Sequence, residues 1–158
     1  MSEHVVDVSW NRGQYEFTYP SYSRDHTWTF DGGDTVTASA NPAYLGSEAA
    51  IDPEEAFVAA LASCHMLTFL VIAAKKRFVV NTYDDHAVGV MAKNDAGRLA
   101  ITTVTLSPRI VFAGAEPDAT TLDQMHHLAH DQCFIANSVT TQVTVAPLSL
   151  APGTGHLA

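Results

Sequence analysis

The sequence is poor in basic residues. Its 158 residues include 8 lysines and arginines against 17 aspartates and glutamates, which gives a formal net charge of −9 at pH 7. Binding to nucleic acid needs a basic surface that neutralises phosphates. The one cationic cluster, Lys75-Lys76-Arg77, is typical of the last turn of a helix, where cations meet the negative end of the helix dipole. The composition therefore argues against a nucleic-acid partner.

Export signals, long apolar runs and cysteines are also scarce. The segment 1–10 is polar and lacks the apolar stretch of a secretory signal. The longest apolar stretch, 56–74, is interrupted by polar residues and predicts a buried helix rather than a membrane span. We therefore expect a cytoplasmic protein without a membrane partner. In that compartment the two cysteines, Cys64 and Cys133, are expected to be free or redox-active rather than joined in a structural disulfide.

The order of the expected elements is β, α, β, α, β. Alternating residues predict strands, and apolar residues at helical spacing predict helices. We expect one domain over 1–146 followed by a flexible, Pro- and Gly-containing tail at 147–158. The expected elements are a β meander at 4–40, a central helix at 52–76, a hairpin at 83–112 with its turn at 94–97, a second helix at 118–132 and a last strand at 140–145.

The central helix has a clear beginning. Asp52 is a favourable N-cap, Pro53 fits the first helical position, and Glu54 and Glu55 suit the positive end of the helix dipole. Both sides of the helix are apolar through its middle, and such a helix is normally covered all round. One chain of this size has difficulty covering it alone, so we expect a second copy of the chain to supply the missing cover.

Two cysteine motifs resemble those of the OsmC/Ohr family. Residues 52–65 resemble the family's central helix, with Pro-Glu at its start, a run of small and apolar residues, and a cysteine ten residues after the glutamate. Residues 130–138 resemble its second motif, in which an apolar pair and Asn-Ser follow the cysteine. With the matching order of elements, the resemblance covers roughly residues 5–146. It implies an α+β, OsmC-like fold, with antiparallel sheets packed around long central helices in an intertwined homodimer.

The resemblance also implies a chemistry. Cys64 would be the peroxidatic thiol and Cys133 the resolving thiol of an enzyme that reduces organic hydroperoxides and hydrogen peroxide in oxidative stress defence. The reaction would pass through a Cys64 sulfenic acid and a Cys64–Cys133 disulfide, and a dithiol such as a lipoylated protein would reduce the disulfide. No cofactor is expected.

A reactive thiol needs a cation beside it. A free cysteine has a pKa of about 8.5 and is mostly protonated at neutral pH, and the helix dipole acts only near helix ends. Family members use an arginine of the N-terminal β block, held by the glutamate of the Pro-Glu motif. The resemblance therefore suggests Arg24 with Glu54, and Arg12 is the alternative. Ten helical positions separate Glu54 from Cys64 by about 15 Å, so we expect Glu54 to serve the Cys64 of the other subunit.

The second helix offers a metal site as an alternative. His126, His130 and Cys133 are spaced i, i+4 and i+7, so they share one helix face, and Cys64 or His65 would complete a tetrahedral zinc set. The simpler interpretation is a helix face that carries polar histidines. A third hypothesis is a non-catalytic protein that binds a small molecule or lipid on the same fold.

The roles of His65 and of the apolar neighbours are less specific. At i+1, His65 points about 100° away from Cys64 around the helix, and we expect a packing or interface residue rather than a base. An apolar site would favour organic hydroperoxides over hydrogen peroxide, although the same residues would also serve as core. The candidates for its lining are Phe57, Leu61, Met66 and Phe134.

Overall fold

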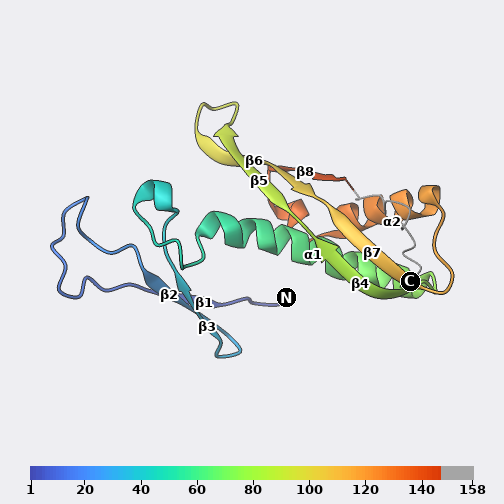
Figure 1. Ribbon diagram of the computed structural model, residues 1–158, viewed down its shortest axis with the longest axis horizontal. Helices are drawn as coiled ribbons and strands as arrows, with labels where there is room; N and C mark the ends of the chain where they lie inside the picture. Colours follow the sequence, from blue (N-terminus) through green and yellow to red (C-terminus); the bar gives the residue numbers. More distant parts are fainter. Residues whose placement is uncertain (147–158) are drawn as a thin grey trace, which may run out of the picture. The chain divides into compact units, whose positions relative to one another are not determined.

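The computed structural model describes residues 1–146, which form two compact units that meet in sequence at Phe57/Val58. Eight strands and two α-helices are present in this part of the chain (Figure 1). The predicted α+β class is confirmed. The tail predicted at 147–158 lies outside the described residues.

The first unit contains a small antiparallel meander. Strands β1 (Val6–Ser9), β2 (His26–Phe30) and β3 (Thr35–Ala38) pair in the order β1-β2-β3. The long segment 10–25 between β1 and β2 forms no strand, although its aromatic residues alternate at 15, 17 and 19. A positive φ of 58° at Gly13 and a turn in which Ser21 N–H donates to the carbonyl of Thr18 (3.0 Å) bend the chain there.

Helix α1 (Pro53–Lys75) begins with a reciprocal cap. The Asp52 carboxylate accepts a hydrogen bond from Glu55 N–H (2.7 Å), and the Glu55 carboxylate accepts one from Asp52 N–H (3.1 Å). The second carboxylate oxygen of Asp52 accepts a bond from the Asn41 amide (2.8 Å). This capping box satisfies N–H groups that a helix start leaves without partners, and it confirms Asp52 as the N-cap.

Helix α1 ends in a Schellman motif. Phe78 N–H donates to the carbonyl of Ala73 (3.0 Å), and Arg77 N–H donates to that of Ala74 (3.0 Å). The motif requires a left-handed residue at the Arg77 position, whose φ is 67°. In the left-handed region the Cβ of an arginine comes too close to the backbone, which costs free energy. A glycine has no Cβ and would avoid this cost.

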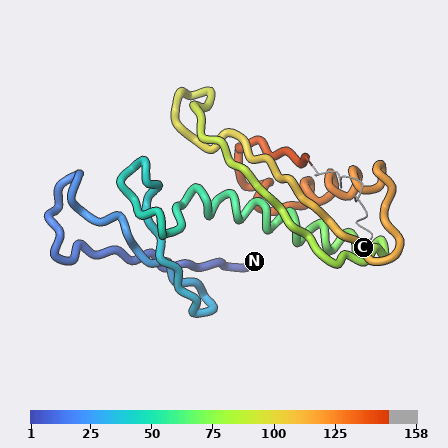
Figure 2. The backbone as a smooth tube through the Cα atoms, viewed as in Figure 1, coloured from blue at the N-terminus to red at the C-terminus, as the bar shows by residue number. Residues whose placement is uncertain are grey.

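A long hairpin follows α1, and Figure 2 shows its path. Its outer pair is β5 (Val88–Lys93) with β6 (Leu99–Leu106), joined by the predicted turn, and its base is β4 (Val79–Asp85) with β7 (Pro108–Ala113). The hairpin therefore begins four residues before the predicted start at residue 83. The Asp85 carboxylate accepts a bond from Ser107 N–H (2.7 Å) where the two pairs meet.

The second helix and the last strand complete the second unit. Helix α2 (Ala119–Gln132) is capped by the Asp118 carboxylate, which accepts a bond from Thr121 N–H (2.7 Å). Strand β8 (Gln142–Val145) then joins β6 in parallel. This parallel pair is possible because the chain returns to β6 through a helical crossover.

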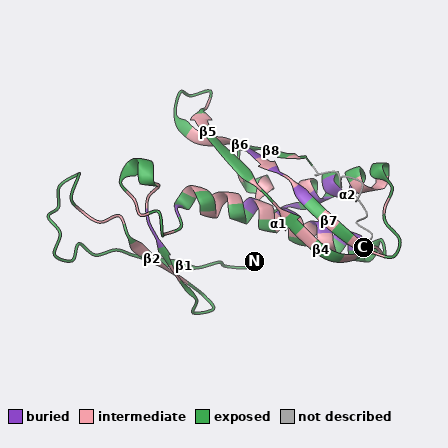
Figure 3. Ribbon diagram, in the orientation of Figure 1, coloured by how far each residue is buried: buried purple, intermediate pink, exposed green. Residues whose placement is uncertain are grey.

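The core of the second unit lies between α1, α2 and the base of the hairpin. Figure 3 shows buried segments on α1 and α2 within otherwise half-buried or exposed helices. Gly89 of β5 makes room for α1, because a Cβ there would lie 2.5 Å from Cγ2 of Val58. The buried cluster consists of Phe69, Ile72, Ala73, Met125 and Ala129, and partly buried side chains of β4, β7 and α2 pack against it.

By length and mean hydropathy alone (2.1 over its best window), α1 could cross a membrane. The central helix of a soluble protein passes the same test. Here Leu61, His65 and Phe69 of α1 are buried within the chain itself. One side of the helix therefore belongs to the core of the chain.

We predict that Arg77→Gly stabilises the protein. Glycine adopts the left-handed conformation without a Cβ penalty, so the free energy of unfolding should rise by about 1 kcal/mol. Urea denaturation measures this difference. Lys75→Gly, a glycine placed in the helix itself, is the matched control and should destabilise by up to about 1 kcal/mol. A loss of stability in Arg77→Gly would contradict the prediction.

Candidate active site

The structure brings the two cysteines together. Cys64 lies in the middle of α1, Cys133 is the C-cap residue of α2, and the free Cys64 thiol lies close enough to the free Cys133 thiol to influence its pKa. Cys64 is half-buried, whereas Cys133 is 1% exposed. The two thiols are therefore close enough to react with each other, and solvent reaches Cys64 more readily.

Burial and the neighbouring thiol keep Cys133 protonated. Burial raises the pKa of the Cys133 thiol to about 11, and the neighbouring Cys64 sulfur acts in the same direction. The N–H of Ala136 donates to Cys133 Sγ (3.4 Å) and opposes this shift without overcoming it. At neutral pH Cys133 is therefore a thiol, not a thiolate.

A pair of buried histidines crosses the same interface between α1 and α2. His65 Nε2 and His126 Nδ1 are 3.1 Å apart, and the two rings stack with centroids 5.4 Å apart and an interplanar angle of 8°. The ring of Phe69 also stacks on His126, with centroids 4.6 Å apart. His65 is 1% exposed and His126 3% exposed. The position of His65 agrees with a packing role rather than that of a base.

The histidine pair is uncharged at neutral pH. Burial lowers the pKa of His65 to about 4, and the nearby imidazoles of His126 and His130 add to the shift. Burial likewise lowers the pKa of His126 to about 4, although the carboxylate of Asp123 opposes this. His65 Nδ1 and His126 Nε2 have no hydrogen-bond partner within residues 1–146. The pair is thus poorly placed to accept a proton.

The two arginine candidates belong to the first unit, as does Glu54. The guanidinium of Arg24 is half-buried and donates to the carbonyls of Tyr19 and Tyr22. Arg12 is exposed and donates only to the carbonyl of Tyr15 (3.4 Å). In the described part of the chain no ion pair joins Glu54 to either arginine. Glu54 lies in the first turn of α1, ten residues before Cys64 on the same unbroken helix.

The metal alternative receives no support from the structure. Within residues 1–146, no group of three or more histidine, cysteine, aspartate or glutamate side chains could hold a metal ion. His126 faces His65 across the helix pair, and Cys133 faces Cys64. His126 and Cys133 therefore make two separate contacts with α1 and do not form one set of metal ligands.

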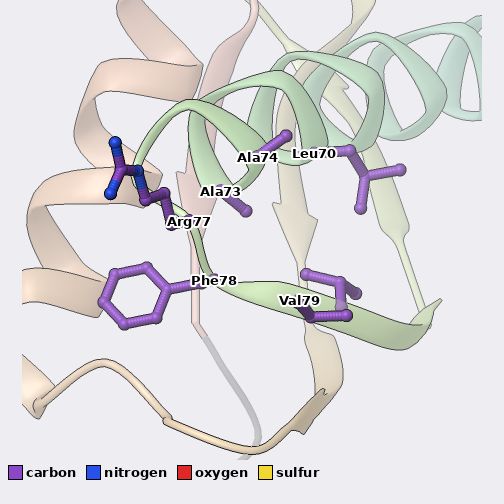
Figure 4. Close-up of a pocket in the computed structure, with 7 residues that line it drawn as sticks. Leu70, Ala73, Ala74, Arg77, Phe78 and Val79 are labelled. Carbon is purple, nitrogen blue, oxygen red and sulfur yellow. The ribbon is translucent and has the colours of Figure 1, made fainter.

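Two pockets of the second unit are lined in part by helix residues. One, of about 310 Å³, is lined by three histidines and Asp123 of α2 together with Val143, Thr144 and Val145 of β8. The other, of about 480 Å³, lies at the end of α1 and is almost entirely apolar. In Figure 4, Arg77 and Phe78 stand at one end of it and Leu70 and Val79 at the other. Neither pocket is lined by a cysteine.

The proposed apolar lining is only partly buried. Leu61 is 1% exposed and belongs to the core, whereas Phe57 and Met66 are half-buried. Phe134 is 81% exposed directly beside the buried Cys133. Of these four candidates, Phe134 therefore offers the largest apolar surface to solvent next to a thiol. The His65–His126 contact was missed by sequence reasoning, because no local pattern pairs two residues 61 positions apart.

We predict that the histidine pair makes the fold sensitive to acid. Because the folded pKa of each histidine lies below the unfolded value of about 6.5, its contribution is present above pH 6.5 and is lost as pH falls toward 4. The loss should reach about 3 kcal/mol per histidine. Measuring the free energy of unfolding from pH 8 to pH 4 tests this. The double variant His65→Leu/His126→Leu should show a shallower slope, and the exposed His4→Leu should keep the wild-type slope. Equal slopes in all three proteins would exclude the histidine pair as the cause.

Comparisons with known proteins agree with this geometry. The OsmC-like protein family model matches residues 46–147. No curated protein matches the chain. An OsmC-like protein of unknown function from Vibrio cholerae is 52% identical, with a TM-score of 0.91, and the match covers 94% of this chain and 100% of that one.

Two more distant structures share the fold. An organic hydroperoxide resistance protein from Elizabethkingia anophelis is 13% identical, with a TM-score of 0.69 and coverage of 93% of this chain and 94% of that one. The organic hydroperoxide resistance protein OhrB of Bacillus subtilis is 15% identical, with a TM-score of 0.64 and coverage of 93% and 98%. The matched family model covers most of the chain, including both cysteine helices, and the chain therefore belongs to the OsmC-like protein family.

Proposed function

We propose that the protein is a thiol peroxidase in which Cys64 attacks the peroxide and Cys133 resolves the product. The proximity of the two free thiols carries this proposal. The organic hydroperoxide resistance proteins that share the fold support a peroxide as the substrate. The reducing cytoplasm, where thiols stay free between turnovers, suits this chemistry.

The first step occurs at the more accessible sulfur. The Cys64 thiolate attacks the distal oxygen of a hydroperoxide, so an S–O bond forms and the O–O bond breaks. The sulfur is oxidised to a sulfenic acid, and the peroxide is reduced and leaves as an alkoxide, or as hydroxide from hydrogen peroxide, which takes up a proton from water to give the alcohol or water. Cys133 is unsuited to this step, because it is 1% exposed and its raised pKa keeps it protonated.

The second step joins the two sulfurs. Cys133 attacks the sulfenic sulfur, the S–S bond forms, and the hydroxyl of the sulfenic acid leaves as water with the Cys133 proton. A dithiol then reduces the disulfide by thiol–disulfide exchange. We propose a lipoylated protein as that dithiol. No cofactor takes part in this reaction sequence.

The thiolate of Cys64 needs a cation, and we propose Arg24 for this role. A neighbouring cation lowers the pKa of a cysteine. Arg24 is preferred to Arg12 because its guanidinium is half-buried and held by two carbonyls, whereas Arg12 is exposed and makes one weak bond. Glu54 is proposed to act at this site from the α1 helix of a second subunit, since ten residues separate it from Cys64 on its own helix.

A homodimer would cover the apolar side of α1 that one chain leaves exposed. Leu67 is 57% and Val71 is 52% exposed, and they continue a stripe of exposed residues at helical spacing that includes Ala60, Ser63 and Ala74. A helix with apolar residues on all sides is stable only when all sides are covered. A second copy of the chain offers the same apolar surface, as a two-fold interface requires.

We propose organic hydroperoxides as the preferred substrates. Phe134 is the exposed apolar side chain next to Cys133, and Met66 is half-buried near Cys64 in sequence. An apolar substituent on the peroxide would contact such side chains, and hydrogen peroxide would not. A comparison of kcat/KM for cumene hydroperoxide and hydrogen peroxide tests this preference.

The roles of the two cysteines predict different products after treatment with one equivalent of cumene hydroperoxide. Intact mass spectrometry should show the loss of two hydrogen atoms in the wild type, since a disulfide forms. Cys133→Ser should instead gain one oxygen that dimedone traps as a sulfenic acid. Cys64→Ser should stay unmodified, because the remaining thiol is buried and protonated. Unreacted thiols in the wild type would show that the protein is not a thiol peroxidase.

The dimer predicts that charges on the exposed stripe separate the subunits. Leu67→Glu/Val71→Glu should be monomeric by sedimentation equilibrium, since burying two carboxylates in an apolar interface is unfavourable. Leu45→Glu, which changes an equally exposed leucine outside the stripe, should remain dimeric. The monomeric variant should also lose peroxidase activity. A folded monomer with full activity would rule out a role for Glu54 of a second subunit.

A further inference from the structure

The segment 10–25 between β1 and β2 contains an aromatic cluster. Tyr22 lies at its centre: the Phe17 ring is 5.2 Å from it, and the Trp10 ring is 6.2 Å away in an edge-on arrangement. Trp10 Nε1–H also donates to the carbonyl of Ser23 (2.7 Å), which fixes the backbone between Tyr22 and Arg24. The cluster therefore holds Tyr22 in place from two sides.

Arg24 lies on this aromatic surface. The central carbon of its guanidinium is 3.9 Å from the centroid of the Tyr22 ring and 5.3 Å from that of Tyr19. The guanidinium also donates to the backbone carbonyls of both tyrosines. These contacts occupy two of its five N–H donors. No carboxylate pairs with Arg24 anywhere in residues 1–146.

This arrangement fixes the guanidinium without neutralising its charge. A carboxylate partner would cancel much of the field of the cation, whereas the face of an aromatic ring and a carbonyl oxygen carry no net charge. A fixed cation also loses less side-chain entropy when it later binds an anion. Three N–H donors and the full charge remain available for a thiolate or a peroxide.

We propose that Tyr22, assisted by Tyr19, is a positioning residue that holds Arg24 ready to stabilise the Cys64 thiolate. The proposal rests on the proposed peroxidase function and on Arg24 as its cation. It assigns a role to the exposed aromatic residues of segment 10–25, which form no strand. It also makes the tyrosine ring, rather than an acidic side chain of the same chain, the group that orients the arginine.

The test compares Tyr22→Leu, Tyr22→Phe and Arg24→Ala, with Tyr15→Leu as a control for the loss of an aromatic ring. Tyr15 is an exposed ring in the same segment and lies outside the contacts of Arg24. The readouts are the apparent pKa of Cys64, from the pH dependence of its alkylation in a Cys133→Ser background, and kcat/KM for cumene hydroperoxide in the otherwise unchanged protein.

Tyr22→Leu should raise the apparent pKa of Cys64 and lower kcat/KM by about tenfold, as expected for the loss of a cation–π contact. Tyr22→Phe keeps the ring and should restore both readouts, and Tyr15→Leu should resemble the wild type. Tyr22→Leu/Arg24→Ala should be no worse than Arg24→Ala alone, because Tyr22 acts through the arginine.

Several outcomes would overturn the proposal, and they are distinguishable. If Arg24→Ala is impaired but Tyr22→Leu is not, or if their effects multiply in the double variant, Tyr22 does not position Arg24. Failure of Tyr22→Phe to restore the pKa of Cys64 would exclude the ring as the holding group, even if Tyr22→Leu does not fold. An unimpaired Arg24→Ala alongside an inactive Cys64→Ser would refute the choice of arginine but not the peroxidase. Full activity in Cys64→Ser would refute the peroxidase itself.

Discussion

The second unit is organised by the need to cover α1, a 23-residue helix that is apolar on almost every side. The base of the hairpin and α2 cover the side that carries Phe69 and Ile72, and Gly89 allows β5 to approach the helix closely. The side with Leu67 and Val71 remains exposed. Apolar surface left in water costs free energy in proportion to its area. The fold of one chain therefore covers one side of α1, and the proposed second copy would cover the other.

The same packing explains the electrostatics of the candidate site. Removal from water disfavours the charged form of any group, so it lowers the pKa of the His65 and His126 imidazoles and raises that of the Cys133 thiol. All three are uncharged at neutral pH. These three groups thus bring no charge to the interface between α1 and α2. A thiolate at Cys64 needs a cation from another part of the protein, which makes the N-terminal arginines essential to the proposed chemistry.

The sequence predicted the features that local patterns encode. The N-cap at Asp52, the limits of α1 and α2 to within one residue, and the turn of the hairpin follow from residue preferences at short range. It did not predict contacts between residues far apart in the chain. Two histidines of α2 suggested a metal site by their spacing, yet His126 pairs with His65 of α1. The Arg24–Glu54 pair, expected across two subunits, stays a prediction; within one chain the Arg24 guanidinium donates to the carbonyls of Tyr19 and Tyr22.

The high pKa of Cys133 is compatible with its proposed role. A protonated thiol is a poor nucleophile, and a resolving cysteine would ordinarily need a base. His65 and His126 are weak bases, since their pKa values are both lowered to about 4. In the proposed reaction, however, the leaving group of the sulfenic acid is a hydroxide, which accepts the Cys133 proton as the S–S bond forms. The two sulfurs are neighbours, so the proton has a short path from one sulfur to the oxygen on the other. Burial can then protect Cys133 from direct oxidation by peroxide without preventing it from resolving Cys64.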